Sequence, residues 1–229
     1  MSEKILNEKK ICFIVCVNNT RCWEECLLYL ERLVIPKGYE VDIITIEDAK
    51  SIASGYNEGM KASDAKYKIY MHQDVFITDA YFLQEMLDVF HIHEKIGMMG
   101  MVGTCKMPCD GVMWNADRVF SIYCKFNKNT DLCSQYTVPK KEDVILVDVI
   151  DGLLMATQYD VEWREDILTD WDFYDASQSM EFHRKGYHVV VPMLNKPMCV
   201  HDDGYILKLG NYDENRKKFL KEYGDEIKG

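Results

Sequence analysis

The run His72-Gln73-Asp74 sets an imidazole, an amide and a carboxylate directly behind an apolar alternation that begins at Tyr67. The alternation predicts a buried strand, so the three polar groups stand where that strand ends. Side chains of these types can hydrogen-bond a polar ligand. The alternative is structural, because His72 and Asp74 could instead cap the strand and the turn that follows it.

Polar residues also follow other predicted strands. In open α/β sheets, ligands bind in the crevice outside the carboxyl ends of the strands, so residues at these ends are the informative ones. The set comprises Asn18-Asn19 after the first strand, Glu47-Asp48 after the second, and Asp151 within a later strand.

Two later stretches, "DILTDWDFYDAS" (166–177) and "MCVHDDGY" (198–205), concentrate further acids and a histidine. A carboxylate within hydrogen-bond reach of a hydroxyl can act as a general base. The candidates for such a base are Asp170, Asp172 and Asp175 in the first stretch, whereas His201, Asp202 and Asp203 in the second offer nitrogen and oxygen atoms that could bind a ligand.

Strands and helices are expected to alternate along most of the chain. Apolar runs predict strands at 10–18, 39–48, from 66, at 96–104, at 144–157 and in the segment that ends at Pro192. Helical spacing predicts helices at 21–35, 51–65, 79–94 with Asp79 as N-cap, from 175 to a C′ glycine at Gly186, and near the C-terminus. This order predicts βαβ units and one α/β domain over residues 1–229, with a mostly parallel central sheet flanked by helices.

Composition excludes several classes of protein. The 229 residues carry a net charge of −11 with acids spread along the chain, which argues against a nucleic-acid polymer as partner. No apolar run is long enough for a membrane span, and the N-terminus does not resemble a signal peptide. Nine cysteines without a repeated spacing favour reduced thiols and a cytoplasmic protein. Neither a G-x-G-x-x-G fingerprint nor a Walker-type loop follows the first strand.

The ordered set of motifs resembles the GT-A glycosyltransferases of the family 2 group, and specifically a small bacterial glycosyltransferase-like branch. The resemblance rests on "YNEGMKASDAKYKIYMHQDVFI" and on the later "DG" and "FYDAS" segments, and it extends from Ile11 to His201. It implies a GT-A domain in which residues 1–104 bind a nucleotide-diphosphate sugar and residues 105–229 form the acceptor and catalytic half.

The same resemblance assigns the strand-end run to a D-x-D motif. Asp74 takes the place of the acid that touches a divalent metal, Mn or Mg, on the diphosphate. His72 replaces the first acid, which removes one charge from the site, and Gln73 stands between them. His201 matches a histidine that approaches the metal or diphosphate, although it could also belong to a solvated loop.

For the general base, the resemblance points to Asp175, with Asp172 as the alternative. Asp175 is equally suited to cap the helix that it begins, and an engaged cap is a weaker base. The residues implied in nucleotide-sugar binding are Val17, Asn18, Asp48, Asn57, His72, Gln73, Asp151 and Gly152. Asn57 could instead be a polar position of its helix, and Gly152 could mark a bulge.

The expected function is transfer of a sugar from a nucleotide-diphosphate sugar to a hydroxyl acceptor, with inversion and help from a divalent metal. Uracil is the expected base, and an enzyme of surface-polysaccharide synthesis working in the bacterial cytoplasm or at the inner membrane face is implied by the likeness. The alternatives are a nucleotide-sugar-binding protein without turnover and a GT-A-like nucleotidyltransferase. Assembly of identical copies stays open.

Two further groups have more than one interpretation. Cys105 and Cys109 with His91 and His93 fit no common zinc-finger spacing, so incidental or structural cysteines are expected. The tryptophans beside the expected cleft, Trp114 and Trp171, could stack on a sugar or fill the core.

Overall fold

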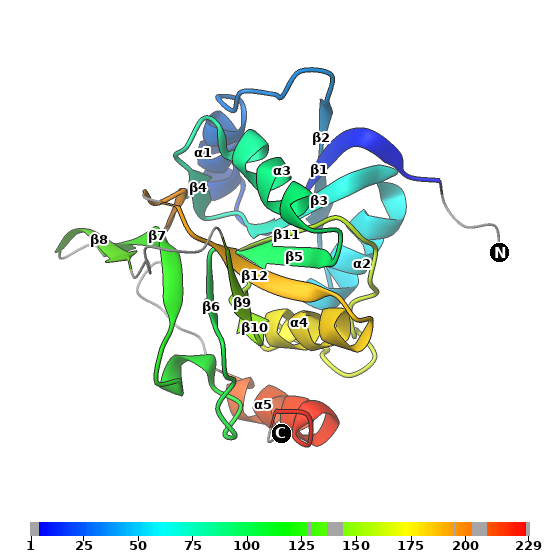
Figure 1. Ribbon diagram of the computed structural model, residues 1–229, viewed down its shortest axis with the longest axis vertical. Coiled ribbons are helices and arrows are strands. Elements are labelled where there is room, and N and C mark those ends of the chain that lie inside the picture. Colours follow the sequence, from blue (N-terminus) through cyan, green and yellow to red (C-terminus); the bar gives the residue numbers. More distant parts are fainter. Residues whose placement is uncertain (1–4, 128–129, 137–143, 195, 203–209, 228–229) are drawn as a thin grey trace.

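The computed structural model describes residues 5–127, 130–136, 144–194, 196–202 and 210–227. A seven-stranded sheet lies at its centre, in the order β2-β1-β3-β11-β5-β12-β9 (Figure 1). Its strands are β1 (Asn7–Val17), β2 (Glu40–Glu47), β3 (Ala65–His72), β5 (Ile96–Gly100), β9 (Val144–Val147), β11 (Leu154–Thr157) and β12 (His188–Pro192). Five strands point the same way, and β11 and β9 are antiparallel to their neighbours. The predicted α/β fold with a mostly parallel sheet is confirmed.

The three N-terminal strands end together at one edge of this sheet. β1 is buried from Ile11 to Val15, and it lies between β2 and β3 in parallel register. Val17 pairs with Glu47, while Cys16 pairs with His72. This register places the residues that follow all three strands side by side, as expected for a parallel sheet.

A second sheet has the order β10-β6-β7-β13-β4, with β8 paired to β7. Its strands are β4 (Val75–Ile77), β6 (Val102–Thr104), β7 (Phe120–Asn127), β8 (Thr130–Tyr136), β10 (Val149–Ile150) and β13 (Cys199–His201). The single strand predicted at 96–104 is therefore wrong, because it breaks at Met101 and passes from the central sheet to the second. The segment 144–157 is interrupted around Asp151 and also at Asp148, so that β9 and β11 lie in the central sheet and β10 between them lies in the second.

The helices are α1 (Thr20–Leu30), α2 (Ile52–Ala62), α3 (Phe82–Ile92), α4 (Tyr174–Arg184) and α5 (Tyr212–Tyr223), with a short 3₁₀ turn η1 (Met113–Asn115). α2 packs on the first strands through its small residues. A Cβ on Gly55 would lie 2.5 Å from the Sγ of Cys16, and one on Gly59 would overlap Ile14. These two glycines thus permit a close approach of the helix to the sheet.

Two predicted helix boundaries are wrong. α1 ends at Leu30 rather than near residue 35, because the chain turns at Arg32 and Leu33 and Pro36 cannot continue a helix. α3 begins at Phe82, and Asp79 is not its N-cap. The Asp79 carboxylate instead accepts a hydrogen bond from the backbone N–H of Tyr81 and pairs with Lys196.

α4 ends at Arg184, and Gly186 is its C′ residue as predicted, with a φ of +82°. The backbone N–H groups of Gly186 and Tyr187 bond to His183 and Phe182, a Schellman arrangement. α5 packs against α4 at the end of the molecule that holds the C-terminus (Figure 1). No helix of the described part of the chain is both long and apolar enough to cross a bilayer.

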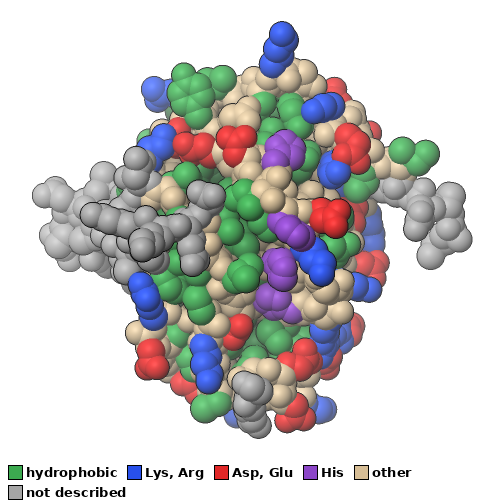
Figure 2. Space-filling model, viewed as in Figure 1, with side chains coloured by type: hydrophobic (Ala, Val, Ile, Leu, Met, Phe, Trp, Pro, Cys, Tyr) green, Lys and Arg blue, Asp and Glu red, His purple; other side chains and the backbone are tan. Residues whose placement is uncertain are grey.

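The surface facing the viewer in Figure 2 is mixed in charge. Basic side chains stand among acidic ones there, and the described side chains form no continuous basic patch on this face. A nucleic-acid backbone requires such a concentrated basic surface. This face therefore lacks the electrostatic feature of a nucleic-acid-binding protein.

Candidate functional site

A cavity of about 710 Å³ brings together residues that are far apart in the sequence. A volume of this size suits a nucleotide or a drug-sized ligand. Of the predicted site residues, those that line it are His72, Asp74, Asp151, Gly152, Asp172, Asp175 and His201. The candidate metal ligands and both candidate bases therefore face one common cavity.

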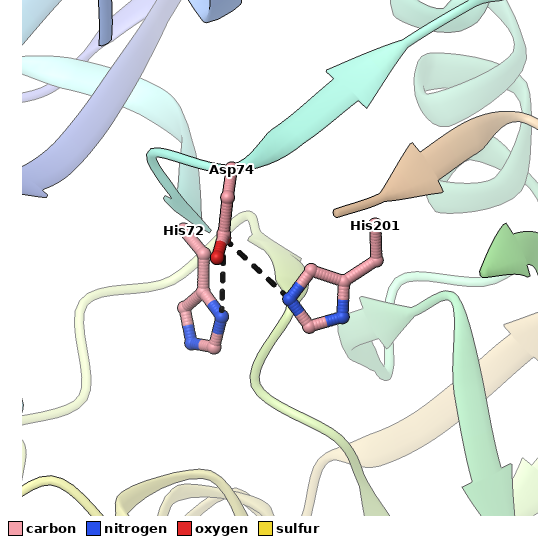
Figure 3. Close-up of side chains that lie close together, drawn as sticks. All are labelled: His72, Asp74 and His201. Atoms are coloured by element: carbon pink, nitrogen blue, oxygen red, sulfur yellow. Dashed lines mark ion pairs between the residues drawn. The ribbon is translucent and has the colours of Figure 1, made fainter. Parts of the chain in front are cut away.

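His72, Asp74 and His201, all of which line this cavity, form a compact cluster (Figure 3). His72 ends β3, Asp74 lies in the turn before β4, and His201 ends β13. β13 pairs antiparallel with β4 in a register that sets His201 opposite Val75. The pairing of β13 with β4 therefore brings His201 close to His72, although the two residues are far apart in the sequence.

The potential ligand atoms of the three residues all lie within 4.8 Å of one another. Oδ1 of Asp74 is 3.9 Å from Nδ1 of His72 and 3.5 Å from Nε2 of His201. This buried oxygen has no hydrogen-bond partner among the described residues. A buried carboxylate oxygen without a donor, between two imidazoles, fits a divalent cation.

The charges of the cluster favour the states that bind metal. Burial opposes ionisation of Asp74, but the neighbouring His201 and His72 outweigh it and lower the pKa of the carboxyl. Burial, together with the nearby His201, lowers the pKa of His72. An ionised carboxylate and a neutral imidazole are the forms that coordinate metals.

Tyr174, which has no assigned role in the sequence-based prediction, contacts this cluster. Its hydroxyl lies 2.5 Å from Nε2 of His72. The tyrosine ring fits only because residue 152 is glycine, since a Cβ there would overlap the hydroxyl and ring of Tyr174. The sequence signal that could have identified Tyr174 is its position in "FYD", directly before the candidate base Asp175 at the start of a predicted helix.

Asp175 lies in the first turn of α4, and the alternative of an N-cap role is wrong. Phe173 occupies the N-cap position with a φ of 63°. The Asp175 carboxylate accepts hydrogen bonds from the backbone N–H groups of Gly152 and Ala176, each at 2.8 Å. Burial, and then the charge of Asp151, raise the pKa of Asp175 to about 7.

The two neighbouring acids differ in their surroundings. Asp172 lines the cavity, and burial raises the pKa of its carboxyl. Asp170 lies outside the cavity lining, and its carboxylate accepts hydrogen bonds from Asn211 and Asn215 at 3.3 to 3.4 Å. Asp170 therefore ties the start of α5 to this loop, which leaves Asp172 as the alternative base.

Four residues predicted to contact the nucleotide, Val17, Asn18, Asp48 and Gln73, are not among those that line the cavity. Oε1 of Gln73 accepts hydrogen bonds from the backbone N–H groups of Asn18 and Asn19 at 3.1 and 3.0 Å. The Gln73 amide also donates to the side chain of Asn18 at 2.5 Å. Asp48 is exposed at the end of β2 with a φ of 54°, and Val17 ends β1. Gln73 thus joins two strand ends.

Asn57 is not part of the cavity. Its side chain is buried, donates to the backbone carbonyl of Trp163 and to Glu165, and accepts from the N–H of Trp163. These bonds hold the 163–165 segment against α2. We therefore do not include Asn57 among the residues proposed to bind the nucleotide sugar. Cys105 and Cys109 are exposed, and the three-ligand cluster found among the described residues is the one at His72.

Comparisons with known proteins show the family and the fold of the chain. Residues 12–223 match the model of a family described as "Glycosyltransferase like family". The chain belongs to this glycosyltransferase-like family. A search of the curated proteins finds no match to it.

Solved structures of GT-A glycosyltransferases share the fold of this family member. One is the mannosyltransferase PcManGT from Pyrobaculum calidifontis in complex with GDP-Man and Mn2+, with a TM-score of 0.61 and 11% identity over 97% of this chain. Another is S. aureus TarS 1-349 in complex with UDP-GlcNAc, with a TM-score of 0.52 and 13% identity over 95% of this chain. The chain covers 65% of the mannosyltransferase, less than two thirds of its length, and 70% of the TarS fragment.

Proposed function

We propose that the chain transfers a sugar from a nucleotide-diphosphate sugar to a hydroxyl acceptor, with inversion at the anomeric carbon. The observation that carries the proposal is the single cavity in which the cluster around Asp74 and the carboxylate of Asp175 both lie. Membership of a glycosyltransferase-like family supports the reaction class.

His72, Asp74 and His201 would hold a divalent cation, Mn or Mg, at the end of β3. Such an ion, when bound, neutralises the diphosphate leaving group. The cluster has one carboxylate and two imidazoles, a donor set that suits Mn better than Mg. The Pyrobaculum mannosyltransferase is in complex with Mn2+, which is consistent with that choice.

Asp175 would act as the general base. The acceptor hydroxyl loses its proton to this carboxylate while its oxygen bonds to the anomeric carbon, and the bond from that carbon to the diphosphate oxygen breaks with its electron pair. Each Asp175 oxygen accepts one backbone N–H and keeps a lone pair for the hydroxyl. A pKa of about 7 suits a base that works near neutral pH.

The nucleotide would lie along the ends of β1 to β3, against Val17, Asn18, Asp48 and Gln73. Uracil is our expected base, although the similar structures include a complex with GDP-Man as well as one with UDP. Asp151 and Gly152 would line the sugar and acceptor side. We place the reaction in the bacterial cytoplasm, in the synthesis of a polysaccharide.

A binding protein without turnover is the second candidate, because His72 stands where a D-x-D motif has its first acid. Calorimetry with UDP and Mn, followed by assays of UDP-glucose, UDP-GlcNAc and GDP-mannose hydrolysis, separates the two. We expect Asp175→Asn to lower the turnover rate about 10²- to 10⁴-fold while UDP affinity survives.

Asp172→Asn is the matched control, since this acid lines the same cavity. Loss of rate in Asp172→Asn but not in Asp175→Asn would transfer the base role to Asp172. UDP binding without hydrolysis of any donor, unchanged by Asp175→Asn, would favour the binding protein. Anomeric configuration of the product, read by NMR, tests the inversion.

A further inference from the structure

Two of the four tryptophans line the cavity with half-exposed rings. Trp114 lies in η1 and is 50% exposed, and Trp171 lies three residues before the start of α4 and is 49% exposed. Within the described part of the chain, neither indole has a contact with another aromatic ring, a cation or a hydrogen-bond acceptor. About half of each ring therefore faces the solvent, and neither indole N–H donates a hydrogen bond to a described residue.

Trp163 provides the contrast within the same molecule. It is 2% exposed, and its ring centroid lies 4.9 Å from those of both Tyr56 and Tyr70. This is the environment that folding gives to a tryptophan whose purpose is packing, because burying a large ring is favourable. Two large rings left half exposed at one cavity indicate a ligand rather than a core.

The charge of the cavity wall restricts what that ligand can be. The wall carries the carboxylates of Asp74, Asp151, Asp172 and Asp175, and no Lys or Arg is among the described residues that line it. Carboxylates accept hydrogen bonds from hydroxyl groups, whereas they repel a second anion. Asp172 directly follows Trp171, so an indole face and a hydrogen-bond acceptor stand next to each other in the wall.

We propose that Trp114 and Trp171 bind the acceptor substrate, and that this acceptor is an uncharged carbohydrate. The proposal rests on the proposed function, since it takes the acceptor of that transfer as the occupant. The C–H face of a sugar ring lies against an indole, whose π face carries partial negative charge, and the ring hydroxyls donate to carboxylates such as Asp172. An acceptor bearing phosphate or carboxylate groups would instead face carboxylates, with no lysine or arginine among the described lining residues to balance its charge.

The first test uses protein labelled with 5-fluorotryptophan, with its four ¹⁹F resonances assigned through single Trp→Phe variants. Maltotriose, cellotriose and chitotriose are the neutral probes, and trigalacturonate is the anionic one, each titrated with and without UDP and Mn. We expect a neutral trisaccharide to move the Trp114 and Trp171 resonances and to leave Trp23 and Trp163 in place. If none of the neutral probes moves them, or trigalacturonate moves them equally, the proposal is wrong.

The second test compares variants by the affinity for the trisaccharide that binds. Trp114→Ala and Trp171→Ala should each weaken it roughly tenfold, as expected for loss of one aromatic contact, and Phe at either position should restore part of it. Leu146→Ala, which truncates an exposed side chain on β9 away from the cavity lining, is the control and should change nothing. Unchanged affinity in both Ala variants would overturn the assignment.

UDP affinity, measured by calorimetry on the same samples, separates this proposal from the proposed function. Sugar binding at the two indoles with no UDP binding would contradict the transferase while leaving the carbohydrate site intact. UDP binding and donor hydrolysis without any response of the two indoles would support the transferase and contradict the carbohydrate site. Movement of these resonances by UDP-glucose alone would assign them to the donor and overturn the acceptor proposal.

Discussion

The hydroxyl of Tyr174 lies 2.5 Å from Nε2 of His72, and this contact joins the helix that carries Asp175 to the strand end that carries the candidate metal ligands. With Nε2 engaged, Nδ1 of His72 faces Oδ1 of Asp74 at 3.9 Å and is the nitrogen left for a cation. Metal-binding histidines are commonly oriented through their second nitrogen in this manner. Tyr174 would therefore orient a ligand of the proposed cation without touching the ion.

Tyr174→Phe should weaken Mn binding about tenfold, because loss of a group that orients a metal ligand typically costs tenfold or more in affinity. Calorimetric titration with Mn measures this directly, and ¹⁵N NMR of the His72 ring reports the change of tautomer in the metal-free protein. Tyr212→Phe is the control, since Tyr212 lines the cavity but its ring packs on Phe173. Equal Mn affinity and an unchanged tautomer would contradict the orienting role.

Gly152→Ala should lower both stability and metal affinity. The new Cβ would overlap the Tyr174 hydroxyl, so the ring must move away from His72. Overpacking of this kind costs about 1–3 kcal/mol of the free energy of unfolding, measurable by urea denaturation. Gly210→Ala is the matched control because a Cβ there meets nothing within 4 Å. A stable variant with wild-type Mn affinity would contradict the expected displacement.

The transfer rate should rise with pH through about 7, because Asp175 must be deprotonated to accept the hydroxyl proton. A profile of kcat/KM from about pH 5 to about pH 9 measures this rise in rate. In Asp151→Asn the rise should occur at lower pH, since the charge of Asp151 helps to raise the pKa of Asp175. A rate that falls through this range would contradict the base assignment.

Stability should change in the opposite direction over the same range. Burial and Asp151 raise the pKa of Asp175 from 3.8 to about 7, so the folded protein holds a proton that the unfolded chain releases. The contribution is fully present below about pH 4 and is lost as the pH rises through 7. Urea denaturation of wild type and Asp175→Asn at several pH values should show a steeper loss of stability between about pH 4 and 7 in the wild type than in the variant.

Gln73→Ala should weaken UDP binding while leaving Mn binding unchanged. The Gln73 amide holds the backbone of Asn18 and Asn19 and the side chain of Asn18. Each such hydrogen bond contributes about 0.5–1.5 kcal/mol, so a loss of severalfold to tenfold in UDP affinity is expected. Calorimetry with each ligand separately measures the two effects. Equal loss of both ligands would indicate general unfolding of the strand ends instead.

Much of the site could be predicted because local sequence places polar residues at strand ends. The apolar alternation before His72 and the buried run at Ile11–Val15 each have a definite strand period, and parallel strands bring their ends to one edge. The partner of Asn57 could not be predicted in this way. Its amide binds the backbone of Trp163, a partner that no local pattern connects with α2.

By itself, the amino-acid sequence determined the alternating elements, the α/β class and the group of acids and histidines, since these follow from periodicity and residue type. Only the tertiary structure decided which of those residues meet. The antiparallel pairing of β13 with β4 brings His201 to Asp74, and the missing Cβ of Gly152 lets Tyr174 reach His72. Such contacts depend on strand register and side-chain volume between distant segments, which a linear pattern does not encode.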